Sequence, residues 1–164
     1  MKKICWLLLV TVFLCGCSAE QTVERVYDEL IIPAMAPAEE LFVMVPEDAV
    51  RTALAGDDGA QLYFCEDYCL SLQTVPSGDL DRTVRGLCGF GTERLTMLET
   101  SQGGVKRWDW TWSCAGEAGD QVGRGMVLDD GDYHYCMTVL ADEAKSGGLD
   151  EQWDRLFSTA CLQR

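Results

Sequence analysis

The chain has few histidines, few basic residues and few long apolar segments. Its 164 residues include one histidine, and its 13 Lys and Arg are outnumbered by 27 Asp and Glu. Zinc sites are usually built from closely spaced pairs of Cys or His. A single histidine and cysteines that lie mostly singly along the chain therefore argue against a metal centre. The acidic excess repels nucleic acid, which is therefore not an expected partner. We expect neither a metal nor any other cofactor.

Only one stretch is apolar over many residues, and it lies at the N-terminus. Lys2 and Lys3 precede an apolar run that starts at Ile4 and stops at Gly16. This run has about 13 residues, whereas a bilayer-spanning helix needs roughly 20, and no later segment is apolar for long enough. A positive start, a short apolar centre and a small residue at the end are typical of a signal peptide.

The signal peptide ends in Leu14-Cys15-Gly16-Cys17. This motif resembles the lipobox of the bacterial lipoprotein family, with Cys15 at a position where Ala or Ser is usual. The resemblance implies that residues 1–16 are removed and that Cys17 receives a diacylglyceryl thioether. It also implies that the protein is anchored in the cell membrane on the extracytoplasmic side, because two acyl chains bury many CH2 groups at about 0.8 kcal/mol each. Ordinary secretion after cleavage near Ala19 is the competing interpretation.

Removal of residues 1–16 leaves 148 residues, a length suited to one domain with its own core. We expect residues 17–24 to form the lipidated cysteine and a tether, and residues 25–164 to form a single extracytoplasmic domain. With 11 basic and 27 acidic residues, the mature chain has a net charge of −16. Its acidic run at residues 129–132 indicates a turn between strands and not a calcium loop.

Hydrophobic periodicity predicts two or three helices among six or seven strands. Seven strands are expected at 41–45, 61–65, 68–75, 94–100, 105–114, 121–128 and 133–140, with the region near residues 23–27 as a further candidate. The helices are expected at 46–54, 79–88 and 149–162. Short turns favour antiparallel pairing, so we expect an α+β sandwich with helices 79–88 and 149–162 packed on one antiparallel sheet. We take Gly123 and Gly125 to mark a bulge. The order of these elements is similar to that of a PsbP-like domain, an extracytoplasmic binding and assembly fold, and this likeness implies a fold alone.

Six cysteines remain after Cys5 and Cys15 are removed with the signal and Cys17 is lipidated. They are candidates for up to three disulfide bonds, as an even number in an exported domain suggests: Cys65, Cys69, Cys88, Cys114, Cys136 and Cys161. The alternative is buried free thiols, since free cysteine packs as a small hydrophobe. Cys65 and Cys69 can pair with each other only if residues 66–68 turn.

Trp108, Trp110 and Trp112 alternate with polar residues, which places three indoles on one face of a strand. They form a possible ligand face for sugar rings or another apolar ligand. The simpler interpretation, which we favour, is a sheet face buried beneath a helix.

His134 is the only histidine, and it lies in no recognisable catalytic motif. A lone histidine is more often a hydrogen-bonded structural residue than a catalyst. A hydrolase or thiol enzyme that uses His134 would need a pocket holding it beside an acid or a free thiol.

Taken together, these patterns predict a lipid-anchored, non-enzymatic binding or assembly module with no catalytic residues. Its partners are the membrane, through the lipid, and a protein or small molecule that the sequence does not identify. The alternative is a surface receptor for a small ligand or glycan that uses the tryptophan face.

Overall fold

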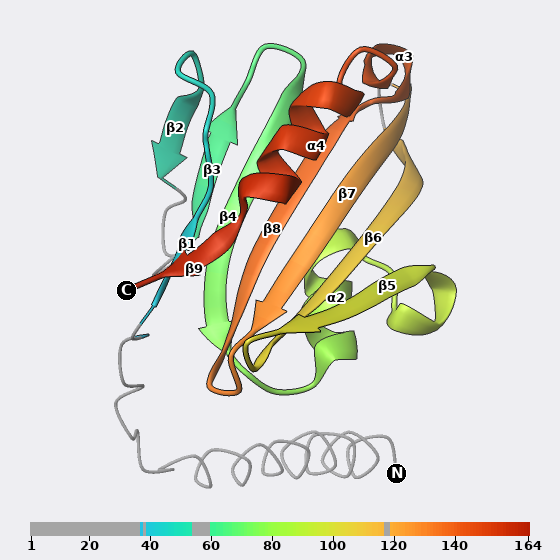
Figure 1. Cartoon of the computed structure of the whole chain (residues 1–164). Helices are drawn as coiled ribbons and strands as arrows, with labels where there is room; N and C mark the ends of the chain where they lie inside the picture. Colours follow the sequence, from blue (N-terminus) through green and yellow to red (C-terminus); the bar gives the residue numbers. More distant parts are fainter. Residues whose placement is uncertain (1–36, 38, 54–59, 117–118) are drawn as a thin grey trace, which may run out of the picture. The chain divides into compact units, whose positions relative to one another are not determined.

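The computed structural model describes residue 37 and residues 39–53, 60–116 and 119–164. The signal peptide, Cys17 and the strand expected near residues 23–27 lie outside the described residues. The main feature is an antiparallel seven-stranded sheet with the order β2-β3-β4-β8-β7-β6-β5 (Figure 1). Its strands are β2 (Val50–Ala53), β3 (Gln61–Phe64), β4 (Tyr68–Pro76), β5 (Met97–Gln102), β6 (Val105–Gly116), β7 (Gly119–Asp129) and β8 (Tyr133–Asp142).

Helices cover both faces of this sheet. Helix α4 (Asp150–Thr159) crosses one face and α2 (Leu80–Cys88) lies on the other, with the short α3 (Glu143–Ser146) at one end (Figure 1). A small second sheet pairs β1 (Glu40–Phe42) with β9 (Cys161–Gln163). This architecture confirms the predicted α+β class and the predicted packing of two helices on an antiparallel sheet.

The larger core lies between α4 and the central strands. Alternate residues of β4, β7 and β8 point to this face, as the two-residue period of a strand requires. They meet the buried side of α4, where Trp153, Leu156 and Phe157 are at most 7 % exposed. The buried strand residues of this core are Tyr68, Leu70, Leu72, Met126, Leu128, Tyr135, Met137, Val139 and Ala141. Each large apolar side chain buried here contributes roughly 1.5–3 kcal/mol of transfer free energy.

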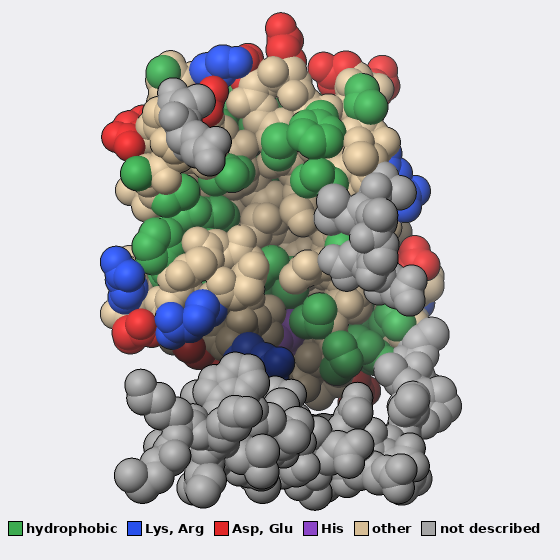
Figure 2. All heavy atoms as spheres, turned by 180° about the vertical axis from the view of Figure 1, so that it is seen from behind, with side chains coloured by type: hydrophobic (Ala, Val, Ile, Leu, Met, Phe, Trp, Pro, Cys, Tyr) green, Lys and Arg blue, Asp and Glu red, His purple; other side chains and the backbone are tan. Residues whose placement is uncertain are grey.

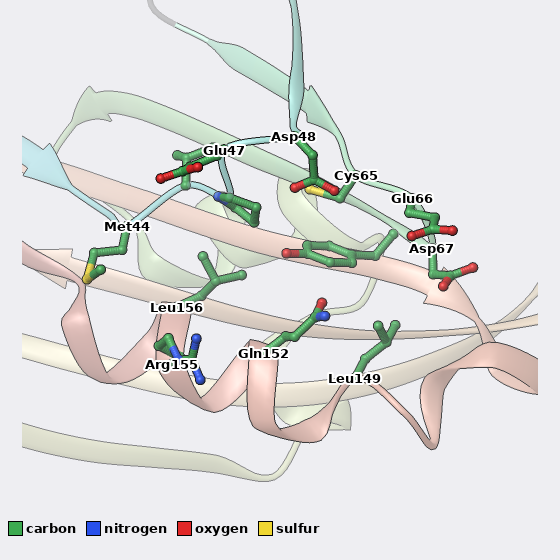
Figure 3. A pocket seen from close by; sticks show the side chains of 13 residues that line it. Met44, Glu47, Asp48, Cys65, Glu66, Asp67, Leu149, Gln152, Arg155 and Leu156 are labelled. Carbon is green, nitrogen blue, oxygen red and sulfur yellow. The ribbon is translucent and has the colours of Figure 1, made fainter.

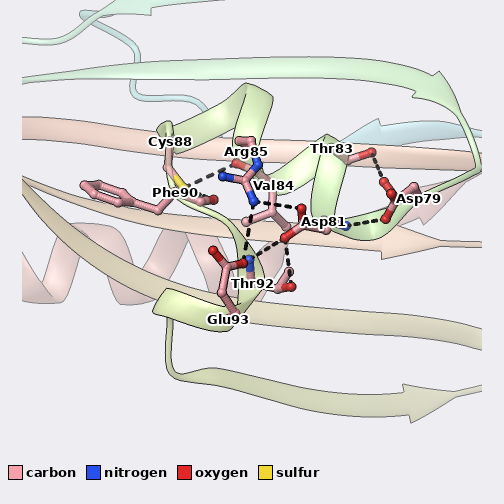
Figure 4. Close-up of polar contacts among 9 residues, drawn as sticks. All are labelled: Asp79, Asp81, Thr83, Val84, Arg85, Cys88, Phe90, Thr92 and Glu93. Carbon is pink, nitrogen blue, oxygen red and sulfur yellow. Dashed lines mark hydrogen bonds and ion pairs between the residues drawn. The ribbon is translucent and has the colours of Figure 1, made fainter.

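The helix expected at 79–88 is confirmed, and polar contacts determine both of its ends (Figure 4). Asp79 is the N-cap and accepts a hydrogen bond from the Asp81 backbone N–H at 3.0 Å. Gly89 ends the helix in the left-handed region at φ 80°, which costs glycine little. The Asp81 carboxylate accepts hydrogen bonds from the backbone N–H of Thr92 (2.7 Å) and from Arg85 (3.0 Å). These bonds, that of Thr92 first, lower the pKa of Asp81 to about 2.

The expected turn at residues 129–132 is also confirmed. It joins β7 to β8, and Gly131 adopts φ 101°. The Asp129 carboxylate accepts a hydrogen bond from the Gly131 N–H at 2.8 Å, and Asp130 accepts one from the Tyr133 N–H at 2.8 Å. These local bonds between aspartate and backbone explain why an acidic run occupies this position.

One predicted helix is wrong and another ends too late. The helix expected at 46–54 is absent from its described residues, because residues 47 and 48 form a turn and residues 50–53 form β2, which pairs with β3 along its whole length. Val50 and Thr52 are β-branched, which favours a strand. Backbone hydrogen bonds to the free edge of β3 stabilise this strand more than the short apolar face of Ala and Val residues would stabilise a helix. The helix expected at 149–162 ends at Thr159, because Ala160 is extended (ψ 121°) and the next three residues pair with β1.

Candidate ligand-binding site

The three tryptophans share one face of β6, as predicted, but they do not form an open platform. Trp110 is 2 % exposed and packs with Val84 of α2, while Trp108 and Trp112 are partly buried against the same cluster. Trp110 is therefore buried beneath a helix, which is the simpler of the two interpretations of the tryptophan face. A flat ligand therefore cannot lie across all three indoles while α2 is in place.

The glycines opposite these tryptophans correct one prediction. Gly123 and Gly125 pair with Trp112 and Trp110 in an uninterrupted register, so they do not mark a bulge. A Cβ atom at either glycine would overlap the facing indole ring. The glycines instead leave room for the rings to lie on β7, a cross-strand pairing of aromatic and glycine residues known to stabilise sheets.

His134 lies on the α2 face of the sheet, the side of the molecule that Figure 2 shows, and is 1 % exposed. Its Nδ1 is 2.9 Å from the hydroxyl of Thr83 on α2, and its Nε2 is 4.0 Å from Asp129. Asp129 also accepts a hydrogen bond from Ser77 at 3.1 Å. An acid is thus beside the histidine, but the group is packed under α2 and does not line the pocket described below. This arrangement links α2 to the sheet.

All six candidate disulfide cysteines are free thiols in the structure, which is the alternative that the sequence analysis left open. Residues 65–68 do turn, since the Cys65 N–H donates to the Tyr68 carbonyl at 2.9 Å. Strand alternation nevertheless directs Cys65 to the α4 face and Cys69, the partner of Phe64, to the other face. Cys88, Cys114, Cys136 and Cys161 are likewise unpaired.

A pocket of about 320 Å³ opens beside α4 and is called the α4 pocket below (Figure 3). Its walls come from three segments far apart in sequence: the connection from β1 to β2, the turn from β3 to β4, and α4. The lining residues are Met44, Val45, Pro46, Glu47, Asp48, Cys65, Glu66, Asp67, Tyr68, Leu149, Gln152, Arg155 and Leu156. The floor is apolar and the rim is charged, which is the usual composition of a small-ligand site.

The rim is mainly acidic. Four of its residues are carboxylates, against the single guanidinium of Arg155. Asp67 pairs with Lys145 at 3.0 Å. Within the described part of the chain, the other three carboxylates and Arg155 form no ion pair. In Figure 3, Asp48 lies beside Cys65, and Arg155 lies at the end of the pocket where Met44 and Glu47 are found.

Tyr68 is 5 % exposed and lines the α4 pocket, and among the described residues its hydroxyl has no nitrogen or oxygen partner. The polar group beside it is the Cys65 thiol, which is a weak hydrogen-bonding group. The ring packs edge-on against Trp153 of α4, with centroids 6.3 Å apart and planes at 76°. Burial raises the pKa of the Tyr68 hydroxyl well above its ordinary value, and the neighbouring Cys65 thiol and Asp48 carboxylate add to this rise. A buried hydroxyl without a partner usually costs about 1–3 kcal/mol, so this group is available to a ligand.

Burial is also the largest influence on the Cys65 thiol, whose pKa is raised. Asp48 raises it further, while Tyr68 opposes the rise. The protonated thiol is a poor nucleophile and a poor metal ligand. In the part of the chain that the structure describes, no three His, Cys, Asp or Glu side chains gather closely enough to hold a metal ion.

The α4 pocket is not predictable from the sequence. Its residues carry no motif, and the segment of Asp48 was expected to be helical. The relevant signal is the hairpin between β3 and β4, whose turn contains Glu66 and Asp67, but nothing local shows that α4 lies against it.

Comparisons with known proteins show the fold. The cyanobacterial PsbP protein CyanoP of Synechocystis sp. PCC 6803 is 10 % identical, with a TM-score of 0.57 over 75 % of this chain and 86 % of CyanoP. LpqN, described as involved in cell envelope biogenesis of Mycobacterium tuberculosis, is 10 % identical, with a TM-score of 0.50 over 80 % of this chain and 88 % of LpqN. The domain therefore has the PsbP-like fold that the order of elements predicted.

Two further comparisons give no match: no protein-family model and no curated protein matches this sequence. Among the described residues, no helix has the length and apolar character needed to cross a bilayer.

Proposed function

We propose that the protein is a lipoprotein anchored on the extracytoplasmic side of the cell membrane through Cys17, and that its domain is a non-enzymatic binding or assembly module. The proposal rests mainly on one combination, a lipobox at residues 14–17 ahead of a PsbP-like domain. LpqN, which has a similar fold, is itself described as acting in cell envelope biogenesis.

The distance along the chain fits this arrangement. Residues 18–39 separate Cys17 from β1, and 22 residues extend to at most about 75 Å. An anchor at Cys17 would keep the domain within this distance of the membrane surface. The strongly acidic domain would not bind an anionic lipid surface by itself, so the lipid would provide the attachment.

The α4 pocket supports binding over catalysis. Its thiol, Cys65, has a raised pKa, and the only histidine lies on the opposite face of the sheet. A catalytic thiol needs a lowered pKa or an adjacent histidine base, and Cys65 has neither, because His134 contacts Thr83 of α2. The buried hydroxyl and the carboxylates of the pocket suit recognition of a ligand.

The anchor is tested by comparing Cys17→Ala with Cys15→Ala in cells fed labelled palmitate. Cys15→Ala is the matched control, because it removes a neighbouring thiol while giving the lipobox its usual residue. We expect the wild type and Cys15→Ala to take up label and to sediment with membranes. Cys17→Ala should lose the label and stay unprocessed. Equal labelling of both variants, or no label in the wild type, would refute the anchor.

A further inference from the structure

We propose that the α4 pocket binds a protonated amine carried on a short apolar stem. This inference rests on the proposed role as a binding module and specifies the ligand class. The observations that carry it are the acidic rim, the small apolar floor, and the buried hydroxyl of Tyr68, which has no nitrogen or oxygen partner among the described residues.

Charge selects a cation. Once Asp67 is paired with Lys145, Glu47, Asp48 and Glu66 remain as carboxylates without an ion-pair partner among the described residues. Arg155 offsets one of them and lies toward the Met44 end of the pocket (Figure 3). An ammonium group near Asp48 is therefore attracted, and a carboxylate or phosphate would be repelled.

Hydrogen bonding selects an ammonium group over a bulky cation. An ammonium has three N–H donors and no acceptor. The α4 pocket supplies oxygen acceptors from the Asp48 carboxylate, the Tyr68 hydroxyl and the Gln152 side chain, which come from its three different walls. Binding would give the buried Tyr68 hydroxyl a charged donor, a stronger partner than the Cys65 thiol beside it.

Size and lining limit the rest of the ligand. A volume of about 320 Å³ lies at the lower end of the range for ligand sites, roughly 300–1,000 Å³. Leu149, Leu156 and Val45 form apolar walls. They suit a stem of one ring or a few methylene groups. Such a group occurs in a free amine and in the lysine side chain of a partner protein.

The first experiment titrates the full-length protein with 2-phenylethylamine and with its neutral isostere 2-phenylethanol, using ligand-observed NMR. We expect saturable binding of the amine and at least tenfold weaker binding of the alcohol. A second titration tests a lysine side chain. It compares the binding of N-acetyl-lysine amide with that of the same compound acetylated on Nζ, which carries no charge. Binding of phenylethylamine alone indicates a free amine, whereas binding of both amines indicates that a lysine side chain is also accepted.

Variants locate the binding to the α4 pocket. Asp48→Asn keeps the side-chain shape and should weaken amine binding about tenfold, because the negative charge that pairs with the ammonium is lost and only a neutral acceptor remains. Tyr68→Phe removes only the hydroxyl and should weaken binding about threefold or more without loss of thermal stability. The matched control is Asp132→Asn, which changes an exposed carboxylate outside the pocket, and it should bind the amine like the wild type.

Arg155→Gln gives a second, opposite readout. It removes a positive charge from the rim, so amine binding should be unchanged or tighter. Equal binding of 2-phenylethanol and the amine, no saturable binding of either amine, or wild-type affinity in Asp48→Asn would each overturn the inference. Loss of the lipid anchor would leave these titrations unchanged, so the two proposals fail independently.

Discussion

The indole of Trp110 lies against Gly125, its cross-strand partner, so closely that a methyl group at residue 125 would overlap the ring. The other side of the same indole faces α2, where Val84 is fully buried. Trp110 is thus enclosed between a bare strand backbone and a helix. The fit explains why glycine occurs in the middle of β7, where it otherwise weakens a strand.

Gly125→Ala should therefore destabilise the domain by about 1–3 kcal/mol, the usual cost of overpacking a core. Gly123→Ala is the matched control, because its ring, Trp112, is partly exposed and can move away. We expect a clearly smaller loss for this variant in urea unfolding followed by tryptophan fluorescence. Equal losses would contradict the enclosure of Trp110 by α2.

Thr83→Val should destabilise the domain by about 1–3 kcal/mol, because it leaves a buried nitrogen of His134 without its hydrogen-bond partner. Valine has nearly the same shape, so little packing is lost. Thr111→Val, at an exposed position of β6, should change stability by no more than about 0.5 kcal/mol. The measurement is the free energy of urea unfolding at neutral pH. A Thr83→Val variant as stable as the wild type would show that this bond does not hold α2.

Asp81 should make stability depend on pH in the acid range. Its pKa is about 2 in the folded protein, below its ordinary value of 3.8, because the Thr92 backbone and Arg85 stabilise the carboxylate. Its contribution is therefore present above about pH 4 and is lost as the pH falls toward 2. Asp81→Asn should be less stable than the wild type at pH 7 and should lose less stability between pH 4 and 2.

The matched control for this series is Asp132→Asn, whose carboxylate makes no ion pair among the described residues. Its melting temperature should follow that of the wild type across the same range. If Asp81→Asn and the wild type keep a constant difference in melting temperature from pH 7 to pH 2, the role of Asp81 is refuted.

Thiol reactivity should differ widely among the six cysteines of the domain. Cys161 is exposed and should react first with a thiol reagent, without prior reduction. Cys136 is fully buried, and this burial raises its pKa to about 12, so it should react only after unfolding. The labelled protein is digested and analysed by mass spectrometry at successive times, and Cys161→Ser should lose the fast phase. Thiols that resist labelling in unfolded, unreduced protein would instead indicate disulfide bonds.

Local sequence signals predicted a large part of the fold. Both ends of α2, at Asp79 and Gly89, were predictable because helix capping is a local interaction. The spacing of Trp153, Leu156 and Phe157 identified the buried face of α4. Strand alternation likewise placed the three tryptophans on one face.

The parts that were missed depend on partners distant in sequence. Residues 50–53 form a strand because they pair with the free edge of β3. Cys161 is not helical because residues 161–163 pair with β1 as a strand. The α4 pocket was missed for the same reason. Asp48 and Arg155 are more than 100 residues apart in sequence, and they line the same pocket only because α4 packs on the sheet.

The account depends most on the lipid at Cys17, and the intact mass of the membrane-extracted protein tests it most directly. The expected result is a chain whose first residue is Cys17, with the added mass of a diacylglyceryl group. A mass that corresponds to an unmodified chain, or to a chain cleaved near Ala19, would contradict it.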